Sequence, residues 1–182
     1  MRYNKCRGFN VYNVVVLSTQ LTYLTKEINK KLKKFCNWIE KPKKTHITLK
    51  YLGYFENYKE KEILRLIPKI KKISIKYMPL KIRLLSINIF ENKEQDLLSI
   101  FIKVKKSKKL REFHYKLKYS LKPIDHFTFQ EGHYYSPHIT LAHAKIKNKE
   151  KIVRLIEKIK FKEREIIFDK LGIYLKRSIK II

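Results

Sequence analysis

The four residues His46-Ile47-Thr48-Leu49 recur unchanged as His138-Ile139-Thr140-Leu141, 92 residues further along the chain. A chain with this content of His and Thr should contain only about 0.2 His-x-Thr triplets by composition. The repeat therefore indicates two related segments rather than a coincidence. Because each copy opens an apolar stretch, we predict that each lies at the start of a β-strand.

The segments around the two copies follow nearly the same order. Hydrophobic spacing predicts strands at 11–17, 45–54, 81–90, 98–104, 136–145 and 165–175, and helices at 21–35, 60–73, 108–121 and 150–159. Pro68 should end or kink the second helix. The order predicts an α+β protein with two lobes related by a pseudo-twofold axis, each contributing one motif strand. Since no low-complexity linker separates the lobes, we expect one two-lobed domain over residues 1–182.

The repeated residues suit acid–base chemistry at phosphorus. On a strand, residues i and i+2 share a face, so His46 projects with Thr48 and His138 with Thr140. If the lobes face each other, these side chains can line one cleft. One imidazole can take a proton from water while the other gives one to the leaving oxygen. The Thr hydroxyls can bind the non-bridging oxygens, which predicts in-line attack on a phosphodiester without a metal.

Other interpretations of the motif carry less weight. A single His-x-Thr is most often a satisfied polar pair, but two identical copies favour a site. Metal binding by the two histidines is weakly supported, because none of the three aspartates lies near either motif. The four glycines are not spaced as a phosphate-binding loop or a dinucleotide fingerprint. We therefore expect neither a metal nor a cofactor.

The chain is strongly basic, with a formal net charge of +28. Such a charge attracts polyanions, and the phosphate backbones of nucleic acids are the obvious candidates. A compositional bias toward lysine explains the charge equally well, because lysine is used throughout the sequence. No signal peptide and no stretch long enough to span a membrane is visible. We expect a cytoplasmic monomer whose two cysteines, Cys6 and Cys36, are reduced thiols.

The extended motifs resemble a known family. The stretch from Thr45 to Gly53, Thr-His-Ile-Thr-Leu-Lys-Tyr-Leu-Gly, and the stretch from Ser136 to Ala142, Ser-Pro-His-Ile-Thr-Leu-Ala, are similar to the paired signatures of the two-histidine phosphoesterases. Within that group they most resemble RNA 2′,3′-cyclic phosphodiesterases, historically called 2′-5′ RNA ligases. Trp38 before the first motif and the late segment 174–178 fit the same branch. The resemblance implies a bilobal fold in which two antiparallel sheets line a central cleft, with helices outside.

The resemblance also implies an activity and roles for residues. The reaction would be hydrolysis of a terminal 2′,3′-cyclic phosphate on RNA to a 2′-phosphomonoester. His46 would donate a proton to the leaving 3′ oxygen, and His138 would be the base that activates water. The family commonly has Arg where this chain has His143. A protonated His143 could contact phosphate in its place, although strict strand alternation from His138 turns it away from the cleft.

Three further residues near the motifs have open interpretations. Tyr134 and Tyr135 could stack on a base or cover the core. Lys44 could meet the RNA backbone, although lysine is common throughout the chain. We treat the remaining histidines as surface or loop residues; they are His114, His126 and His133.

Two other functions compete with cyclic-phosphate hydrolysis. The same site could cleave 2′-5′ linkages, as in enzymes that degrade 2′,5′-oligoadenylate, or could join RNA ends in the reverse direction. Alternatively, the chain is a basic RNA-binding module without catalysis. The intact second copy of the motif argues against that last alternative.

Overall fold

The computed structural model describes residues 9–56, 60–121, 135–175 and 178–182. The helices are α1 (Thr19–Leu32), α2 (Glu60–Arg65), α3 (Ile67–Ser74), α4 (Lys108–Leu121) and α5 (Lys149–Ile159). The strands are β1 (Phe9–Leu17), β2 (Trp38–Ile39), β3 (Ile47–Glu56), β4 (Leu80–Asn92), β5 (Leu97–Val104), β6 (His138–Ala144), β7 (Arg164–Phe168), β8 (Lys170–Leu175) and β9 (Ser178–Ile181). Short 3-10 turns occupy Pro42–Lys44, Lys93–Gln95 and Ile146–Asn148.

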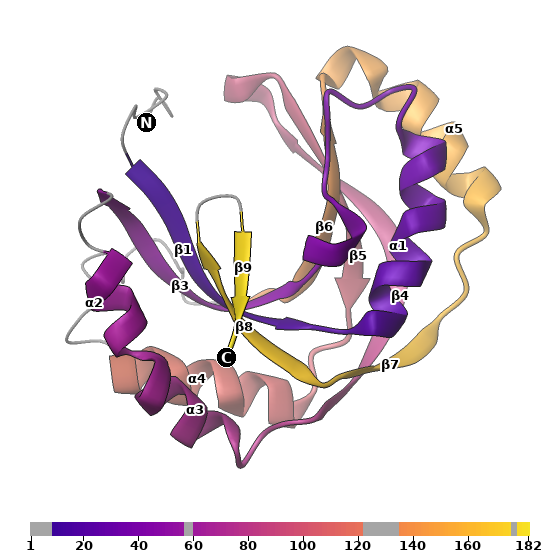
Figure 1. The fold of residues 1–182 in the computed structure, drawn as a ribbon. Coiled ribbons are helices and arrows are strands. Elements are labelled where there is room, and N and C mark those ends of the chain that lie inside the picture. Colours follow the sequence, from indigo (N-terminus) through magenta and orange to yellow (C-terminus); the bar gives the residue numbers. More distant parts are fainter. Residues whose placement is uncertain (1–8, 57–59, 122–134, 176–177) are drawn as a thin grey trace.

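The strands form two antiparallel sheets (Figure 1). Sheet A has the order β3-β1-β8-β9, and sheet B has the order β2-β6-β5-β4-β7. The motif strand β3 lies beside β1 with β8 next to it, and the motif strand β6 lies beside β5 with β4 next to it. This repeated arrangement confirms the predicted α+β fold with two related lobes and one motif strand in each.

One predicted strand is wrong in its extent. The segment 165–175 forms two strands in different sheets: β7 pairs with β4 in sheet B, and β8 pairs with β1 in sheet A. Only Asp169 separates the two strands, so the sequence contains no turn signal at the point where the chain passes between the sheets. The expected helix at 60–73 is broken in the predicted place. Pro68 lies in the first turn of α3, where a missing N–H costs nothing.

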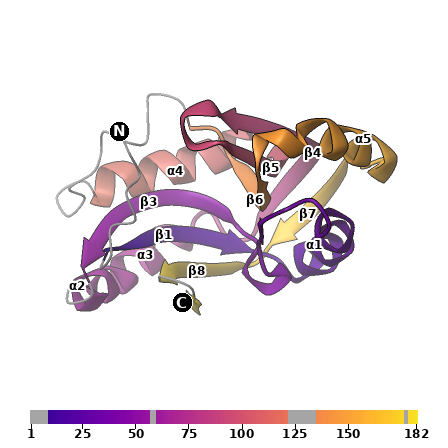
Figure 2. The ribbon, with the colours of Figure 1, turned by 90° about the horizontal axis from the view of Figure 1, so that it is seen from above.

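Two helices each follow a strand of one sheet in the chain but pack against the other sheet. Helix α1 follows β1 of sheet A but packs against β6 and β7 of sheet B, beside α5. Helix α4 follows β5 of sheet B but packs against β3 of sheet A, and the two run alongside each other in Figure 2. The buried side chains of both lobes form one continuous apolar cluster. Both motif strands are therefore anchored in the same core.

Candidate active site

The first motif lies at the edge of sheet A. His46 directly precedes β3, and Thr48 lies opposite Val15 of β1. Both motif side chains are half-buried, whereas Ile47 and Leu49 are fully buried in the core. The ring of His46 lies against Tyr174 of β8, with 5.1 Å between the ring centroids. The apolar residues of the motif thus anchor the strand, while its polar residues share the opposite face.

The second motif opens β6 in sheet B. His138 is exposed and Thr140 is half-buried, while Ile139 and Leu141 are buried. Across the sheet His138 pairs with Lys103 and Thr140 with Phe101. The Phe101 ring meets the His138 ring edge-on at a centroid distance of 5.5 Å. In both copies of the motif, therefore, the Ile and Leu side chains are buried in the core and the His and Thr side chains lie on the opposite face.

The two histidines are held in the same way. His46 Nδ1 lies 2.6 Å from the carbonyl oxygen of Lys44, and His138 Nδ1 lies 2.9 Å from that of Ser136. Each bond runs to the residue two positions earlier in the chain. Because a carbonyl oxygen only accepts, both bonds require a proton on Nδ1. In the neutral ring, Nε2 is then the atom that can take a proton, which is the arrangement an acid–base pair needs.

Burial and the charge of His138 both change the pKa of His46. Burial lowers the pKa of His46 below its usual value, and this effect is partly opposed by the hydrogen bond to the Lys44 carbonyl. The charge of His138 lowers the pKa of His46 further. His138 is therefore near enough to His46 for its charge to disfavour a proton on the His46 ring.

A β-bulge changes the position predicted for His143. The pairing of β5 with β6 shifts between Ile100 and Phe101, so Thr140 pairs with Phe101 and His143 pairs with Ser99. Residues 99, 101 and 103 lie on one face of β5, because alternate residues of a strand share a face. Their partners on β6, which are His143, Thr140 and His138, therefore lie on that same face of the sheet. The expectation from strict alternation, that His143 turns away from the motif residues, is wrong. Sheet A has a corresponding shift beside Thr48.

His143 is half-buried between two neighbours. Its Nδ1 lies 3.1 Å from the Ser99 hydroxyl, and its ring stacks on Trp38 with 4.8 Å between centroids and 25° between planes. Burial lowers the pKa of His143 below its ordinary value. Near neutral pH the ring is therefore mainly uncharged, in contrast to the arginine that the family commonly has at this position.

Lys44 and Tyr135 take part in holding the first motif. Lys44 supplies the carbonyl that binds His46. Burial raises the pKa of the nearby Glu40 carboxyl, and the charge of Lys44 partly opposes that rise. The Tyr135 hydroxyl donates to the carbonyl of Thr48 at 2.9 Å. A role for Lys44 or Tyr135 in contacting RNA stays a prediction. Tyr134 lies outside the described residues.

His114 is not a surface residue as the sequence suggested. It is buried on α4, where its Nδ1 donates to the carbonyl of Leu49 at 2.6 Å. Its ring stacks on Tyr135 with 4.0 Å between centroids and 3° between planes. Helical spacing contained the signal, because position 114 lies one turn after the buried Leu110. His126 and His133 lie outside the described residues.

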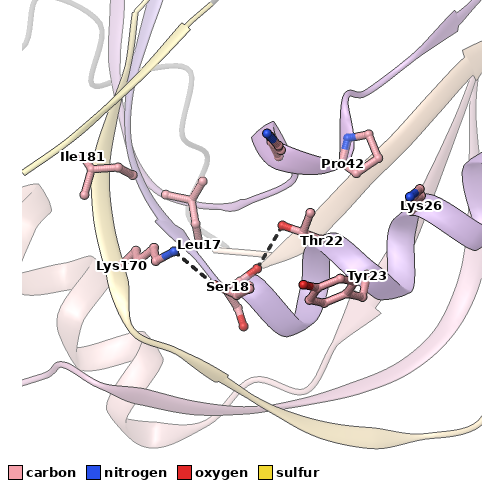
Figure 3. Close-up of a pocket in the computed structure, with 10 residues that line it drawn as sticks. Leu17, Ser18, Thr22, Tyr23, Lys26, Pro42, Lys170 and Ile181 are labelled. Carbon is pink, nitrogen blue, oxygen red and sulfur yellow. Dashed lines mark hydrogen bonds between the residues drawn. The ribbon is translucent and has the colours of Figure 1, made fainter.

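Two pockets of the protein are lined by lysines. The larger of these two, of about 620 Å³, has Lys26, Lys43 and Lys170 among its lining residues (Figure 3). Lys170 Nζ donates to the Thr19 hydroxyl at 3.0 Å. A second pocket, of about 430 Å³, adjoins the second motif. Its lining residues include Phe101, Ser136 and three further lysines, which are Lys103, Lys105 and Lys106. Among the described residues, no acidic side chain lines either pocket, so both suit anionic groups.

Several neighbours of the motifs carried no signal in the sequence. Tyr174, Phe101 and Ser99 come next to the histidines only through strand pairing. Within the described residues, no three His, Cys, Asp or Glu side chains gather as a metal-binding group. None of the described helices is long and apolar enough to cross a membrane.

The comparisons with known proteins agree with this arrangement. The family model of the AKAP7 2′5′ RNA ligase-like domain matches residues 9–174. The chain resembles the crystal structure of TT0787 of Thermus thermophilus, with a TM-score of 0.60, 16% identity and 94% of each chain covered. It also resembles E. coli LigT complexed with 3′-AMP, with a TM-score of 0.55 and 12% identity over 96% of this chain and 94% of that one.

A third similar structure, described as a phosphoesterase, has a TM-score of 0.54 and 11% identity, with coverage of 94% of this chain and 93% of that one. At these identities the structural likeness shows a shared fold. The comparison with curated proteins found no match to this chain. The match of the family model over most of the sequence, together with the two His-x-Thr motifs on paired sheets, places the chain in the AKAP7 2′5′ RNA ligase-like family of two-histidine phosphoesterases.

Proposed function

We propose that the protein hydrolyses the terminal 2′,3′-cyclic phosphate of RNA to a 2′-phosphomonoester. The observation that carries this proposal is the pair of matching histidines, each fixed through Nδ1 to the carbonyl two residues before it and each followed two positions later by a Thr. Their electrostatic coupling supports a site that they share. The lysine-lined pocket beside the second motif supports an anionic substrate.

The reaction would proceed by in-line displacement at phosphorus. One histidine takes a proton from a water molecule while the oxygen of that water forms a bond to phosphorus. The bond from phosphorus to the 3′ oxygen breaks, and the other histidine gives that oxygen a proton. The hydroxyls of Thr48 and Thr140 donate to the non-bridging oxygens, whose charge grows in the transition state. The products are a free 3′ hydroxyl and a 2′-phosphomonoester, and no metal is required.

A paired substrate assay tests this proposal. Two oligonucleotides are compared in the presence of EDTA: one ends in a 2′,3′-cyclic phosphate, and the other is a 2′,5′-linked oligoadenylate. We expect turnover of the first, with a 2′-phosphate as the product. Cleavage of the oligoadenylate alone would keep the site but change the substrate. That alternative is favoured by the family's description as 2′5′ RNA ligase-like. A 3′-phosphate product, or dependence on a metal, would overturn the proposed reaction.

The lowered pKa of His46 leads to a prediction about its role as the proton donor. In the free protein the ring is mainly neutral near pH 7, because its pKa lies below the ordinary value of about 6.5. A donor must be protonated, so we expect the negative charge of a bound phosphate to raise the pKa of His46. NMR titration of the His46 ring, with and without adenosine 2′-monophosphate, measures this change.

The assignment of donor and acceptor can be tested separately with a sulfur leaving group. A cyclic phosphate that carries sulfur in place of the bridging 3′ oxygen needs no proton on departure. We expect this substrate to restore turnover to His46→Ala and to leave His138→Ala inactive. Rescue of His138→Ala instead would exchange the two roles.

A further inference from the structure

An aromatic row crosses the motif-bearing face of sheet B. Trp38 of β2 pairs with His143 of β6, His143 with Ser99 of β5, and Ser99 with Phe90 of β4. Directly paired residues share a face, so these four side chains lie on the same face as His138 and Thr140. The row therefore belongs to the surface that carries the second motif.

The first two members of this row form a stacked pair that stays accessible. The Trp38 and His143 rings are nearly parallel at 4.8 Å, and the Ser99 hydroxyl binds the imidazole at 3.1 Å. Trp38 keeps 41% of its surface exposed and Phe90 keeps 62%, and neither belongs to the apolar core. A fixed aromatic ring with a free surface on a sheet face is the arrangement that stacks unpaired bases in RNA-binding sheets.

The stacked pair lies at a suitable distance from the phosphate-binding residues. Thr140 pairs with Phe101 and His143 with Ser99, so the two positions are two residues apart along β5, or about 7 Å. This spacing is comparable with the span from the phosphate of a nucleotide to its base. The mainly neutral His143 ring is better suited to stacking than to holding a phosphate.

We propose that Trp38 and His143 form a stacking subsite for the nucleobase of the nucleotide whose phosphate is bound at the two motifs, with Phe90 placed to meet the base of a neighbouring nucleotide. This proposal rests on the proposed function, because it uses the same phosphate position. It makes the substrate a nucleotide with an unpaired base, recognised by the face of the ring rather than by a sequence-specific edge.

Fluorescence tests the subsite without requiring turnover. Trp38 is the only tryptophan in the chain, so its emission reports on this position alone. We expect adenosine 2′-monophosphate to quench the emission in a saturable way, and ribose 5-phosphate and inorganic phosphate to leave it unchanged. The absence of quenching by the nucleotide, or equal quenching by ribose 5-phosphate, would overturn the proposal. Quenching by the nucleotide without any turnover of cyclic phosphate would instead contradict the proposed function and keep the subsite.

Kinetics then separate stacking from a structural role. We expect Trp38→Ala to raise KM about 5- to 150-fold for adenosine 2′,3′-cyclic phosphate, the range that stacking of one base supplies, with kcat nearly unchanged. Trp38→Phe and His143→Phe keep an aromatic ring and should lose less. The matched control is Tyr119→Ala, which removes an exposed aromatic ring from α4. An equal rise in KM for an abasic ribose 2′,3′-cyclic phosphate would show that Trp38 only supports the fold, and would overturn the proposal.

Discussion

His46→Ala and His138→Ala are each expected to lower kcat on a cyclic-phosphate substrate by about 10²–10⁴, the usual contribution of a positioned acid or base. Both rings are fixed through Nδ1 to a neighbouring carbonyl, so each presents one nitrogen for proton transfer. Removal of either ring leaves water without its base or the 3′ oxygen without its donor. Steady-state kinetics over a range of pH, with the wild type giving a bell-shaped profile, measures the effect.

The controls for this experiment use the same motifs. Thr48→Ala and Thr140→Ala should cost less than the loss of either histidine, because each removes one hydrogen bond to phosphate and leaves proton transfer intact. Tyr119→Ala, which changes only an exposed ring on α4, should behave as the wild type. Each variant must show an unchanged unfolding transition. If both histidine variants retain full activity while folded, the two-histidine mechanism is incorrect.

His114→Ala is expected to lower the free energy of unfolding by about 2–4 kcal/mol, because it creates a cavity and leaves the Leu49 carbonyl without its donor. For a chain of this length, that loss corresponds to a decrease in Tm of roughly 4–16 °C. The edge of β3 is held here by two stacked rings: His114 binds the Leu49 carbonyl and Tyr135 binds the Thr48 carbonyl. Because Thr48 is a motif residue, kcat should fall about tenfold as well.

Three variants separate the contributions of the His114–Tyr135 pair. His114→Asn retains a donor near the position of Nδ1 but loses the stacking, whereas His114→Phe retains an aromatic ring and loses the donor. Tyr135→Phe keeps the stacked ring and removes only the bond to the Thr48 carbonyl. We expect His114→Asn to retain more activity than His114→Phe. A result in which His114→Phe is as active as the wild type would show that the hydrogen bond does not position the motif.

The sequence predicted the elements and the motif faces where a regular period was present. The buried Ile47 and Leu49 alternate with half-buried motif residues, and α4 buries residues at helical spacing. The repeated tetrapeptide, with the similar order of elements around its two copies, predicted two related lobes with one motif strand in each. These features depend on local pattern and on the repeat, and both can be read along the chain.

The failures concern features that depend on partner strands. The bulge that returns His143 to the motif face exists because β6 shifts its register against β5, and nothing within β6 indicates it. The division at Asp169 depends on which strands accept β7 and β8 as partners. The contact of His46 with Tyr174 joins residues 128 positions apart. The burial of Glu40 arises only from the packed structure, so no pattern along the sequence indicates it.

The crossed packing of α1 and α4 ties catalysis to the integrity of the entire chain. Each half of the sequence lends its helix to the sheet of the other half, β2 extends sheet B, and β8 and β9 complete sheet A. A fragment containing only one motif would leave apolar surface uncovered and would have to find a complementary fragment to fold.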